Sequence, residues 1–376
     1  MRYFRYILLL LIVQVLNSCI SQFIPKTSED KELLVVEGLI TDNTDINTIK
    51  LSRSLPLGTK VTLNPVSGYL VTISDDLGNT YSLTETTPGT YVTNPSEFHG
   101  TVGRSYTLHL NPNSPKNSHY YESYAMEMKP VPPIDSLFYE KVIIEPASNS
   151  SAEKTGAQIY LNTHDPENAC RYYRWEFTET WEFILPYMVP NNICWISANS
   201  DVINIKNTTI IAEDKIERFP LNYISNETDR LREKYSILVN QYSMNEVEYL
   251  YWEKLQKFSQ EVGGLYDMIP SAVSSNILCI DDPNQKVQGY FSVSANTSKR
   301  IFIKDHFTGL ANPYSADRCV ADTIFDGNWP QGIGDYVWII ASQFMPPYIV
   351  TSYVKGCYDC TVRGTKIPPD FWNFDK

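Results

Sequence analysis

Cys19 is the residue whose surroundings point most directly to a chemistry. Arg2 and Arg5 give a basic start, residues 7–13 form an apolar run, and Leu16-Asn17-Ser18-Cys19 closes the segment. This order is typical of a bacterial secretory signal with a lipoprotein cleavage site, in which the cysteine accepts the lipid. The apolar run is too short to span a membrane as a mature helix. We therefore expect residues 1–18 to be removed and Cys19 to become a lipid-attached N-terminus. The alternative is an ordinary signal peptide with a chance cysteine.

Six further cysteines are all placed beyond residue 165, and an even count outside the cytoplasm predicts up to three structural disulfides. The candidates are Cys170, Cys194, Cys279, Cys319, Cys357 and Cys360. The sequence leaves their pairing open. Cys357-Tyr358-Asp359-Cys360 has the CxxC spacing of a thiol oxidoreductase, which needs a helix N-terminus to lower the thiol pKa. The residues that follow show no helical pattern, so we favour a structural role for this motif.

Other catalytic and metal-binding patterns are missing from the sequence. The five histidines form neither HExxH nor His-x-His, so the sequence predicts no metal site and no cofactor. Asp75-Asp76 and Asp281-Asp282 could bind calcium but lack EF-hand spacing, and solvated turns explain them better. No Gly-x-Ser-x-Gly elbow occurs. We therefore expect a protein that is not an enzyme.

Aromatic side chains are the remaining candidates for ligand or partner binding. Tyr173, Trp175 and Trp181 lie on one predicted strand and share a face by parity if no bulge intervenes. Trp338 belongs to a later aromatic cluster. Exposed aromatic rings bind peptides or glycans by stacking and anchor protein interfaces. The alternative, that these rings form the core of a sandwich, is at least as strong.

Length, composition and charge limit what can position these residues. A chain of 376 residues is too long for one comfortable core, so two domains are expected. The net charge is −12 and no basic tract occurs, which argues against nucleic acid and against electrostatic binding to anionic lipid. The 26 tyrosines, with threonine and branched aliphatic residues, favour strands. No second apolar run is long enough to span a membrane, so lipid alone would attach the chain to one.

The first part of the chain predicts a tether and then an all-β domain. Residues 19–31 are polar and without periodicity, as expected of a tether. Residues 32–128 alternate short strand patterns with turn signals about every ten residues, which indicates an immunoglobulin-like β-sandwich. Residues 129–135 (KPVPPID) are proline-rich, and we expect a stiff linker and the domain boundary there.

The remainder, residues 136–376, predicts a second sandwich-like β domain of the immunoglobulin or fibronectin kind. Strand patterns cover 171–185, 201–211, 234–242, 286–295 and 299–303. An amphipathic helix is predicted near 243–262, with Ser243 and Glu246 as a capping box. Its stripe is formed by Val247, Leu250, Tyr251, Lys254, Leu255, Phe258 and Val262. Residues 305–376 are loop-rich and predict a disulfide-bound extension wrapped on this domain.

Several segments together resemble a known family. They are Leu34-Val35-Val36-Glu37-Gly38, Val71-Thr72-Ile73-Ser74-Asp75, Pro88-Gly89-Thr90-Tyr91, Gly103–Leu108, Pro130–Leu137, Tyr172-Tyr173-Arg174-Trp175 and Tyr235–Val239. In this order they are similar to the Bacteroidota lipoprotein family called domain of unknown function 4249. Members of that family carry the lipoprotein signal and are encoded near TonB-dependent outer-membrane receptors.

The resemblance implies an outer-membrane lipoprotein that is exposed on the cell surface, with the periplasmic face as the alternative. It would be an accessory or substrate-capture partner of a TonB-dependent transporter, held to the membrane through lipid on Cys19. A freestanding adhesin or carbohydrate-binding lipoprotein is the alternative function.

Overall fold

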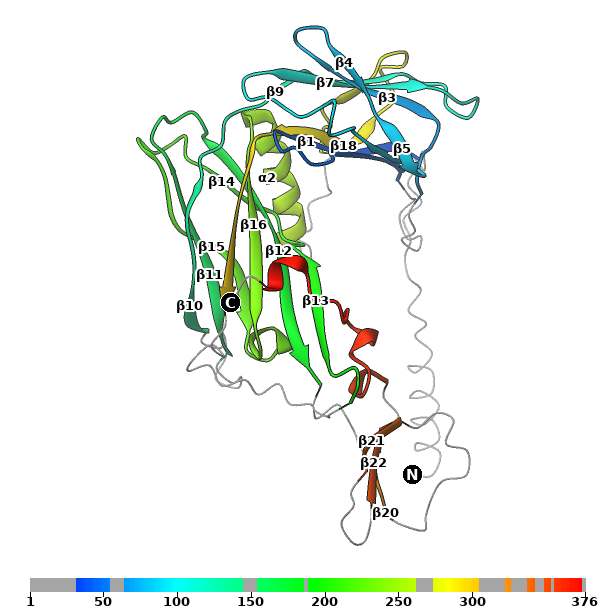
Figure 1. Cartoon of the computed structure of the whole chain (residues 1–376). Helices are drawn as coiled ribbons and strands as arrows, with labels where there is room; N and C mark the ends of the chain where they lie inside the picture. The colour runs from blue at the N-terminus through cyan, green and yellow to red at the C-terminus, as the bar shows by residue number, and fades with distance from the viewer. Residues whose placement is uncertain are drawn as a thin grey trace, which may run out of the picture.

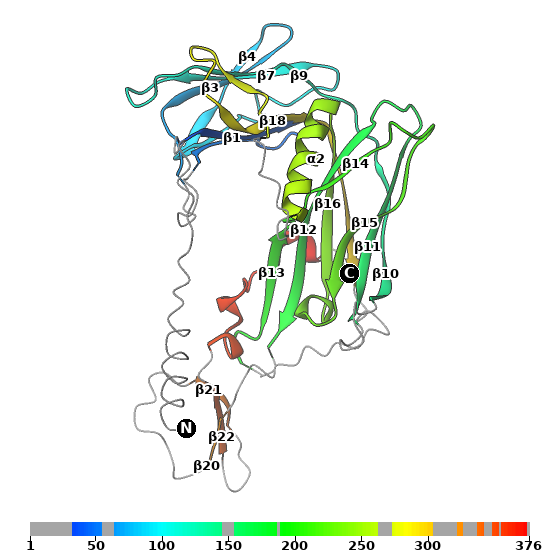
Figure 2. The same ribbon diagram turned by 180° about the vertical axis from the view of Figure 1, so that it is seen from behind.

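The computed structural model describes most of the chain from residue 32 to residue 373 (Figure 1). The described ranges are 32–54, 64–144, 154–185, 189–261, 273–303, 322–325, 337–341, 348–352 and 355–373. Within them the protein is mainly β, as predicted, with one α-helix and several sheets. Two sandwiches lie one against the end of the other, and the helix runs along the second one beneath the first (Figure 2).

The first sandwich consists of two facing sheets. One has the order β18 (Val287–Ser294), β1 (Leu34–Thr41), β2 (Thr48–Arg53), β6 (Thr90–Val92), β5 (Thr84–Thr87). The other has the order β17 (Ile277–Cys279), β8 (Tyr121–Ser123), β7 (Ser105–Pro112), β3 (Tyr69–Asp75), β4 (Thr80–Ser82), and β9 (Met126–Glu127) also pairs with β7. Alternate residues of β7 are buried, so the period-two pattern in the sequence reports the core face. Val36, Ile73 and Leu108 meet there, fully buried.

Two strands of the first sandwich come from late in the chain, which corrects the predicted boundary. Residues 136–376 were expected to form the second domain, yet β17 and β18 complete both sheets of the first. β18 pairs with β1 in parallel, from Leu34 opposite Val287 to Thr41 opposite Ser294. Periodicity shows that residues 286–295 form a strand, but it carries no information about which strand lies beside it.

The second sandwich also has two sheets with a core between them. One has the order β10 (Ile134–Ile144), β11 (Lys154–Asp165), β15 (Asp214–Ser225). The other has the order β13 (Ile193–Asn199), β12 (Tyr172–Ile184), β16 (Tyr235–Ser243), β19 (Asn296–Ile303), and β14 (Asn204–Asn207) pairs with β12. Its core includes Ile159, Tyr173, Trp175 and Ile237, all fully buried.

The remaining elements are short. A small sheet has the order β20 (Asp322–Phe325), β22 (Tyr348–Ser352), β21 (Val337–Ala341). The 3₁₀ helices are η1 (Asp229–Leu231), η4 (Lys355–Cys357), η5 (Cys360–Val362) and η6 (Asp370–Asn373). In the part of the chain that is described, no helix is both long and apolar enough to cross a membrane.

The helix α2 (Glu246–Glu261) begins two residues later than its predicted capping box requires. Asn245 caps it instead, because its Oδ1 accepts a hydrogen bond of 2.9 Å from the backbone N–H of Glu248. The predicted apolar stripe is right at Tyr251, which packs on the core of the first sandwich, but wrong at its first two positions. Val247 is 62% exposed and Leu250 is 46% exposed, whereas Glu248 and Tyr249 are buried. The helix therefore turns a carboxylate and aromatic rings inward.

Ser243, the residue that we predicted to cap the helix, instead connects the two sandwiches. Its hydroxyl donates to the carbonyl of Lys129 at 2.5 Å and accepts from the N–H of Ala295 at 3.1 Å. Lys129 starts the proline-rich linker into β10, and Ala295 is the single residue between β18 and β19. Two of the places where the chain passes between sandwiches are thus joined by one buried hydroxyl.

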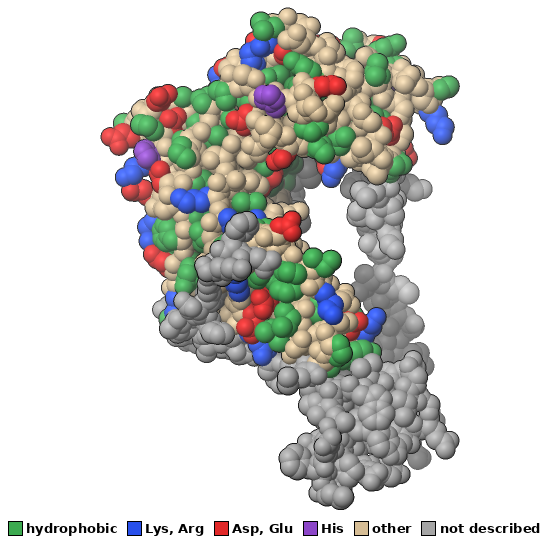
Figure 3. Space-filling model, viewed as in Figure 1, with side chains coloured by type: hydrophobic (Ala, Val, Ile, Leu, Met, Phe, Trp, Pro, Cys, Tyr) green, Lys and Arg blue, Asp and Glu red, His purple; other side chains and the backbone are tan. Residues whose placement is uncertain are grey.

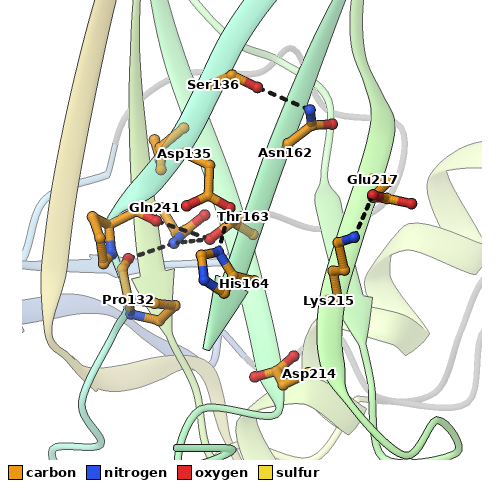
Figure 4. Close-up of polar contacts among 12 residues, drawn as sticks. Pro132, Asp135, Ser136, Asn162, Thr163, His164, Asp214, Lys215, Glu217 and Gln241 are labelled. Atoms are coloured by element: carbon orange, nitrogen blue, oxygen red, sulfur yellow. Dashed lines mark hydrogen bonds and ion pairs between the residues drawn. The ribbon is translucent and has the colours of Figure 1, made fainter. Parts of the chain in front are cut away.

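Gln241 holds the far end of the same linker (Figure 4). Its Nε2 donates to the carbonyl of Pro132 at 2.8 Å and to Oγ1 of Thr163 at 3.1 Å. Its Oε1 accepts from the indole of Trp175 at 2.8 Å. Because Gln241 is fully buried and uses both ends of its amide, it fixes the linker on the core of the second sandwich.

The C-terminal residues 355–373 pack on the second sandwich, as predicted for the extension. Cys360 forms a disulfide with Cys194 of β13, and Trp195 exchanges two backbone hydrogen bonds of 2.9 Å with Thr365. The indole of Trp372 donates to Glu182 of β12 at 3.2 Å. Cys357 is also disulfide-bonded.

Two of the predicted disulfide candidates are free thiols. Cys170 is buried in the core of the second sandwich and Cys279 in that of the first, so the two residues belong to separate cores. The expectation of three disulfides is therefore wrong at these positions. Cys319 lies outside the described residues. The CxxC motif does not close on itself, because Cys360 is bonded to Cys194.

Candidate functional site

Strand β12 places different residues on its two faces, and this separates core from candidate site. Tyr173 and Trp175 stack with ring centroids 5.8 Å apart and are fully buried. The hydroxyl of Tyr173 donates to Asp214 at 2.6 Å, and the indole of Trp175 donates to Gln241. These two rings are thus satisfied core residues, and the prediction that they bind a ligand is wrong.

Trp181 is also buried, with 5% exposure, so the same correction applies to it. Its ring is covered by the guanidinium of Arg230 at 5.1 Å. Trp338 is in β21, and its side chain lies outside what the structure describes. Cys19 precedes the first described residue, so its predicted lipid attachment stays a prediction.

Arg174, between the two core aromatics, is the residue that sequence reasoning missed. Its guanidinium lies between two rings, 4.8 Å from the centroid of Tyr242 and 4.6 Å from that of Trp252. It forms an ion pair with Glu176, and only 6% of its side chain is exposed. A planar delocalised cation suits such stacking. The signal in the sequence is a lone arginine within Tyr172-Tyr173-Arg174-Trp175, at the opposite parity to the rings.

Glu248 is the second residue that the sequence did not single out. It is fully buried on the inner face of α2, and its Oε1 accepts from the indole of Trp252 at 3.3 Å. Burial raises the pKa of its carboxyl, and the positive charge of Arg174 acts against that increase. Tyr290 of β18 is also buried, and burial raises the pKa of its phenol.

Three buried polar atoms at this place lack a hydrogen-bond partner among the described residues. They are Nε of Arg174, Oε2 of Glu248 and the hydroxyl oxygen of Tyr290. An unsatisfied buried polar group costs about 1–3 kcal/mol, and native proteins satisfy most of them. The three atoms lie at the meeting point of β12, α2 and β18, where water or a polar group of a bound ligand would satisfy them.

A pocket of about 380 Å³ opens at this junction, and we call it the inter-sandwich pocket. The first sandwich contributes one wall and the second sandwich with α2 contributes the other. Its lining residues are Glu37, Gly38, Leu39, Thr48, Lys50, Gly289, Tyr290 and Ser292 on the first side, and Arg174, Glu176, Tyr251 and Trp252 on the second. A smaller pocket of about 170 Å³ lies on the other side of Arg174 and Trp252.

The lining combines both signs of charge with aromatic rings. Glu37 and Lys50 are exposed on the first wall, and Arg174 with Glu176 forms the charged part of the second. Tyr251 packs on Tyr290 with centroids 4.6 Å apart, which joins the two walls. Such a pocket suits a small ligand that has a flat apolar part and polar groups. Charges of both signs are also mixed over the face of the molecule in Figure 3, where no large basic patch is visible.

No curated protein matches the chain. The family described as Domain of unknown function (DUF4249) matches residues 20–300, which include the first sandwich and most of the second. That range contains every residue that lines the inter-sandwich pocket. The chain belongs to this family of domains of unknown function.

Proposed function

We propose that the protein is a non-catalytic outer-membrane lipoprotein that captures a ligand for a TonB-dependent transporter. The observation that carries the proposal is the inter-sandwich pocket, where charged and aromatic side chains from both sandwiches converge. The signal and lipoprotein pattern that ends at Cys19 supports the membrane attachment. The resemblance to lipoproteins encoded near such receptors supports the choice of partner.

The joint at Ser243 explains how a pocket between two sandwiches could hold a defined shape. Because one hydroxyl hydrogen-bonds both Lys129 and Ala295, the two walls cannot separate without breaking buried hydrogen bonds. A preformed pocket loses little entropy on binding. A lipid at Cys19 would add to this by keeping the pocket at high local concentration near the transporter.

The half-buried rings of Tyr251 and Trp252 in the pocket favour a second candidate, a freestanding carbohydrate-binding lipoprotein or adhesin. Aromatic rings of this kind stack on sugar rings. In this case the protein would act alone at the cell surface.

Purification from detergent-solubilised outer membranes separates the two proposals. Recovery of the full chain with a β-barrel transporter supports capture for transport. Isolation of the protein alone, together with binding on a glycan array, supports the second candidate.

A variant of the pocket tests whether it is the binding site. This variant replaces Glu37 and Lys50 with alanine, and the control is Lys116→Ala, at an exposed lysine that does not line the pocket. Ligand binding should weaken about tenfold or more in the pocket variant, since a hydrogen bond to a charged group contributes about 1.5–3 kcal/mol. Unchanged binding of the recovered ligand would exclude the pocket as its site.

Membrane attachment and orientation need separate measurements. Cys19→Ala should move the protein from the membrane pellet to the soluble fraction. An unchanged distribution would contradict the lipid anchor. Digestion of intact cells by an added protease should degrade the chain if it is exposed on the surface, and protection would place it on the periplasmic face.

A further inference from the structure

Three side chains with metal-binding donors meet at one end of the first sandwich, away from the inter-sandwich pocket. Nδ1 of His119 lies 2.9 Å from Oδ2 of Asp281, and Sγ of Cys279 lies 3.4 Å from Oδ1 of the same carboxylate. One donor atom from each residue lies within 4.8 Å of the other two. Cys279 is buried, while the side chains of His119 and Asp281 are 36% and 38% exposed. The cluster thus has a buried thiol and two donors that solvent can reach.

The backbone holds these donors in place. Cys279 ends β17 and is opposite Tyr121, the first residue of β8. One step further, the N–H of Ile280 donates to the carbonyl of Tyr120 at 2.8 Å. The N–H of Tyr120 in turn donates to Oδ1 of Asp281 at 2.9 Å. The donors therefore sit at the end of a paired ladder rather than on a free loop, and the carboxylate is oriented by a backbone contact.

We propose that His119, Cys279 and Asp281 form a binding site for a divalent metal ion of the zinc class, with one coordination position open to solvent. A thiolate and an imidazole are donors that zinc prefers, whereas calcium and magnesium prefer oxygen donors alone. Three protein ligands with an open position is the arrangement that leaves room for a water molecule or for a donor from a bound partner.

The spacing of the three donor atoms is close to that of a tetrahedral zinc site. In a tetrahedral zinc site with bonds of about 2.0–2.3 Å, neighbouring donor atoms are about 3.3–3.6 Å apart. The contacts of 2.9 and 3.4 Å reach the two different oxygens of Asp281, and one donor atom from each residue lies within 4.8 Å of the other two. Side-chain rotations that bring the three donors about 1 Å closer together would create the site. On binding, the thiol proton is released to solvent, and the imidazole changes tautomer through solvent, with its proton moving from Nδ1 to Nε2, so that Nδ1 can coordinate. The ion then replaces the hydrogen bond between His119 and Asp281.

The ordinary role for such residues is a hydrogen-bond cluster, and its charge state agrees with the contacts. Burial raises the pKa of the Cys279 thiol, while the backbone N–H of Tyr120 is the main cause of an Asp281 pKa of about 2. A protonated thiol then donates to a carboxylate. The hydrogen-bond cluster and the zinc site are thus two states of the same three side chains, without and with the ion.

The chain supplies matched controls for both donor types. His164 contacts Asp135 with Nδ1 and Oδ2 2.6 Å apart, in a histidine–aspartate pair that belongs to no described group of three metal-binding donors (Figure 4). Cys170 is the other free buried thiol. If zinc merely bound any exposed histidine–carboxylate pair or any free thiol, variants of these residues would also change the affinity.

The test uses the purified full-length protein, stripped with a chelator and titrated with Zn²⁺ against a chromophoric competitor. One equivalent should bind, and Co²⁺ in its place should give a thiolate-to-cobalt charge-transfer band. His119→Asn and Cys279→Ser should each weaken binding by more than about 100-fold, because even outer-shell partners contribute 10–100-fold. Cys279→Ser should also remove the band, while His164→Asn and Cys170→Ser should retain binding and band.

Two results would overturn the site. One is a cobalt complex of the native protein without the thiolate band. The other is an equal loss of affinity in His164→Asn and His119→Asn. Because Cys279 is part of the core, its variant is compared by circular dichroism before titration. His119→Asn, at a partly exposed position, supplies the same test if Cys279→Ser does not fold.

Discussion

Replacing Ser243 with alanine should destabilise the protein more than its single lost hydroxyl suggests. Ser243 and Ala295 are both buried, with 0% and 1% exposure. Alanine would leave the N–H of Ala295 without its partner, which costs about 1–3 kcal/mol, and would remove the hydrogen bond to the partly buried carbonyl of Lys129, which contributes about 0.5–1.5 kcal/mol. We expect a total loss of about 1.5–4.5 kcal/mol in the free energy of unfolding.

Urea unfolding followed by tryptophan fluorescence and by circular dichroism measures this loss. Ser236→Ala is the matched control, because Ser236 is on the same strand, is also fully buried and accepts one side-chain hydrogen bond, from Arg300 at 2.9 Å. The guanidinium of Arg300 is partly exposed, so water can replace the serine hydroxyl, and Ser236→Ala should cost about 1 kcal/mol rather than the larger amount expected for a buried charged hydrogen bond. Ser243→Ala should also separate the two probes, since it loosens the joint between sandwiches. A cost equal to or below that of the control, with coincident transitions, would refute the reasoning.

Three further predictions test the core of the candidate site, the strand pairing and the disulfide. Because the folded-state pKa of Glu248 is raised, the stability it contributes is fully present below the ordinary carboxyl pKa and is lost as pH rises through the raised value. Glu248→Gln should therefore match the wild type near pH 4 and have the higher melting temperature near pH 8, and the reverse order would be contrary to the burial argument. Gly289 has φ of +84°, and an added Cβ would lie 2.0 Å from the carbonyl oxygen of Val36. Gly289→Ala should therefore lower the free energy of unfolding in urea by about 2–4 kcal/mol, and a neutral effect would contradict the pairing of β1 with β18. Cys360→Ser removes a disulfide whose two cysteines are 166 residues apart, and it should lower the free energy of unfolding by about 2–5 kcal/mol. Trypsin should then cleave residues 355–373 faster, and unchanged proteolysis would show that other contacts hold that segment.

Strand positions were predictable because side-chain alternation reports burial directly. The pattern over 234–242 became β16 (Tyr235–Ser243), and that over 171–185 became β12 (Tyr172–Ile184). Partners were not predictable, since a strand with one apolar face fits several neighbours. Thus β18 was assigned to the wrong sandwich although its own limits were nearly right.

The candidate site was less predictable than the fold. Strand parity separates Arg174 from Tyr173 and Trp175, but only the packed layers decide which face is the core. Tyr173 and Trp175 are buried in the core, and Arg174 lies on the opposite face of the strand, against Trp252 of α2. For α2, the predicted stripe was right at Tyr251, which packs on Tyr290, and wrong at Val247 and Leu250, which are exposed. Glu248 and Tyr249 are buried instead, because the contacts of the helix with both sandwiches, and not the apolar pattern alone, decide its inner face.

His119, Cys279 and Asp281 illustrate a third limit of prediction from the sequence. His119 and Asp281 are 162 residues apart, and no spacing rule connects them. They become neighbours only because β17 adds to the edge of β8, a pairing that follows from the late return of the chain to the first sandwich. Short-range motifs therefore could not have indicated this cluster.

The parallel pairing of β1 with β18 also determines how the molecule carries mechanical load. A pull on the N-terminal side enters β1 at Leu34, while the second sandwich pulls on β18 through Ala295. Because the two strands run in the same direction, these forces slide one strand along the other, and all the ladder hydrogen bonds between them resist together instead of opening one at a time. Both strands also line the inter-sandwich pocket. Tension applied from the N-terminal side of β1 would therefore leave this wall of the pocket intact.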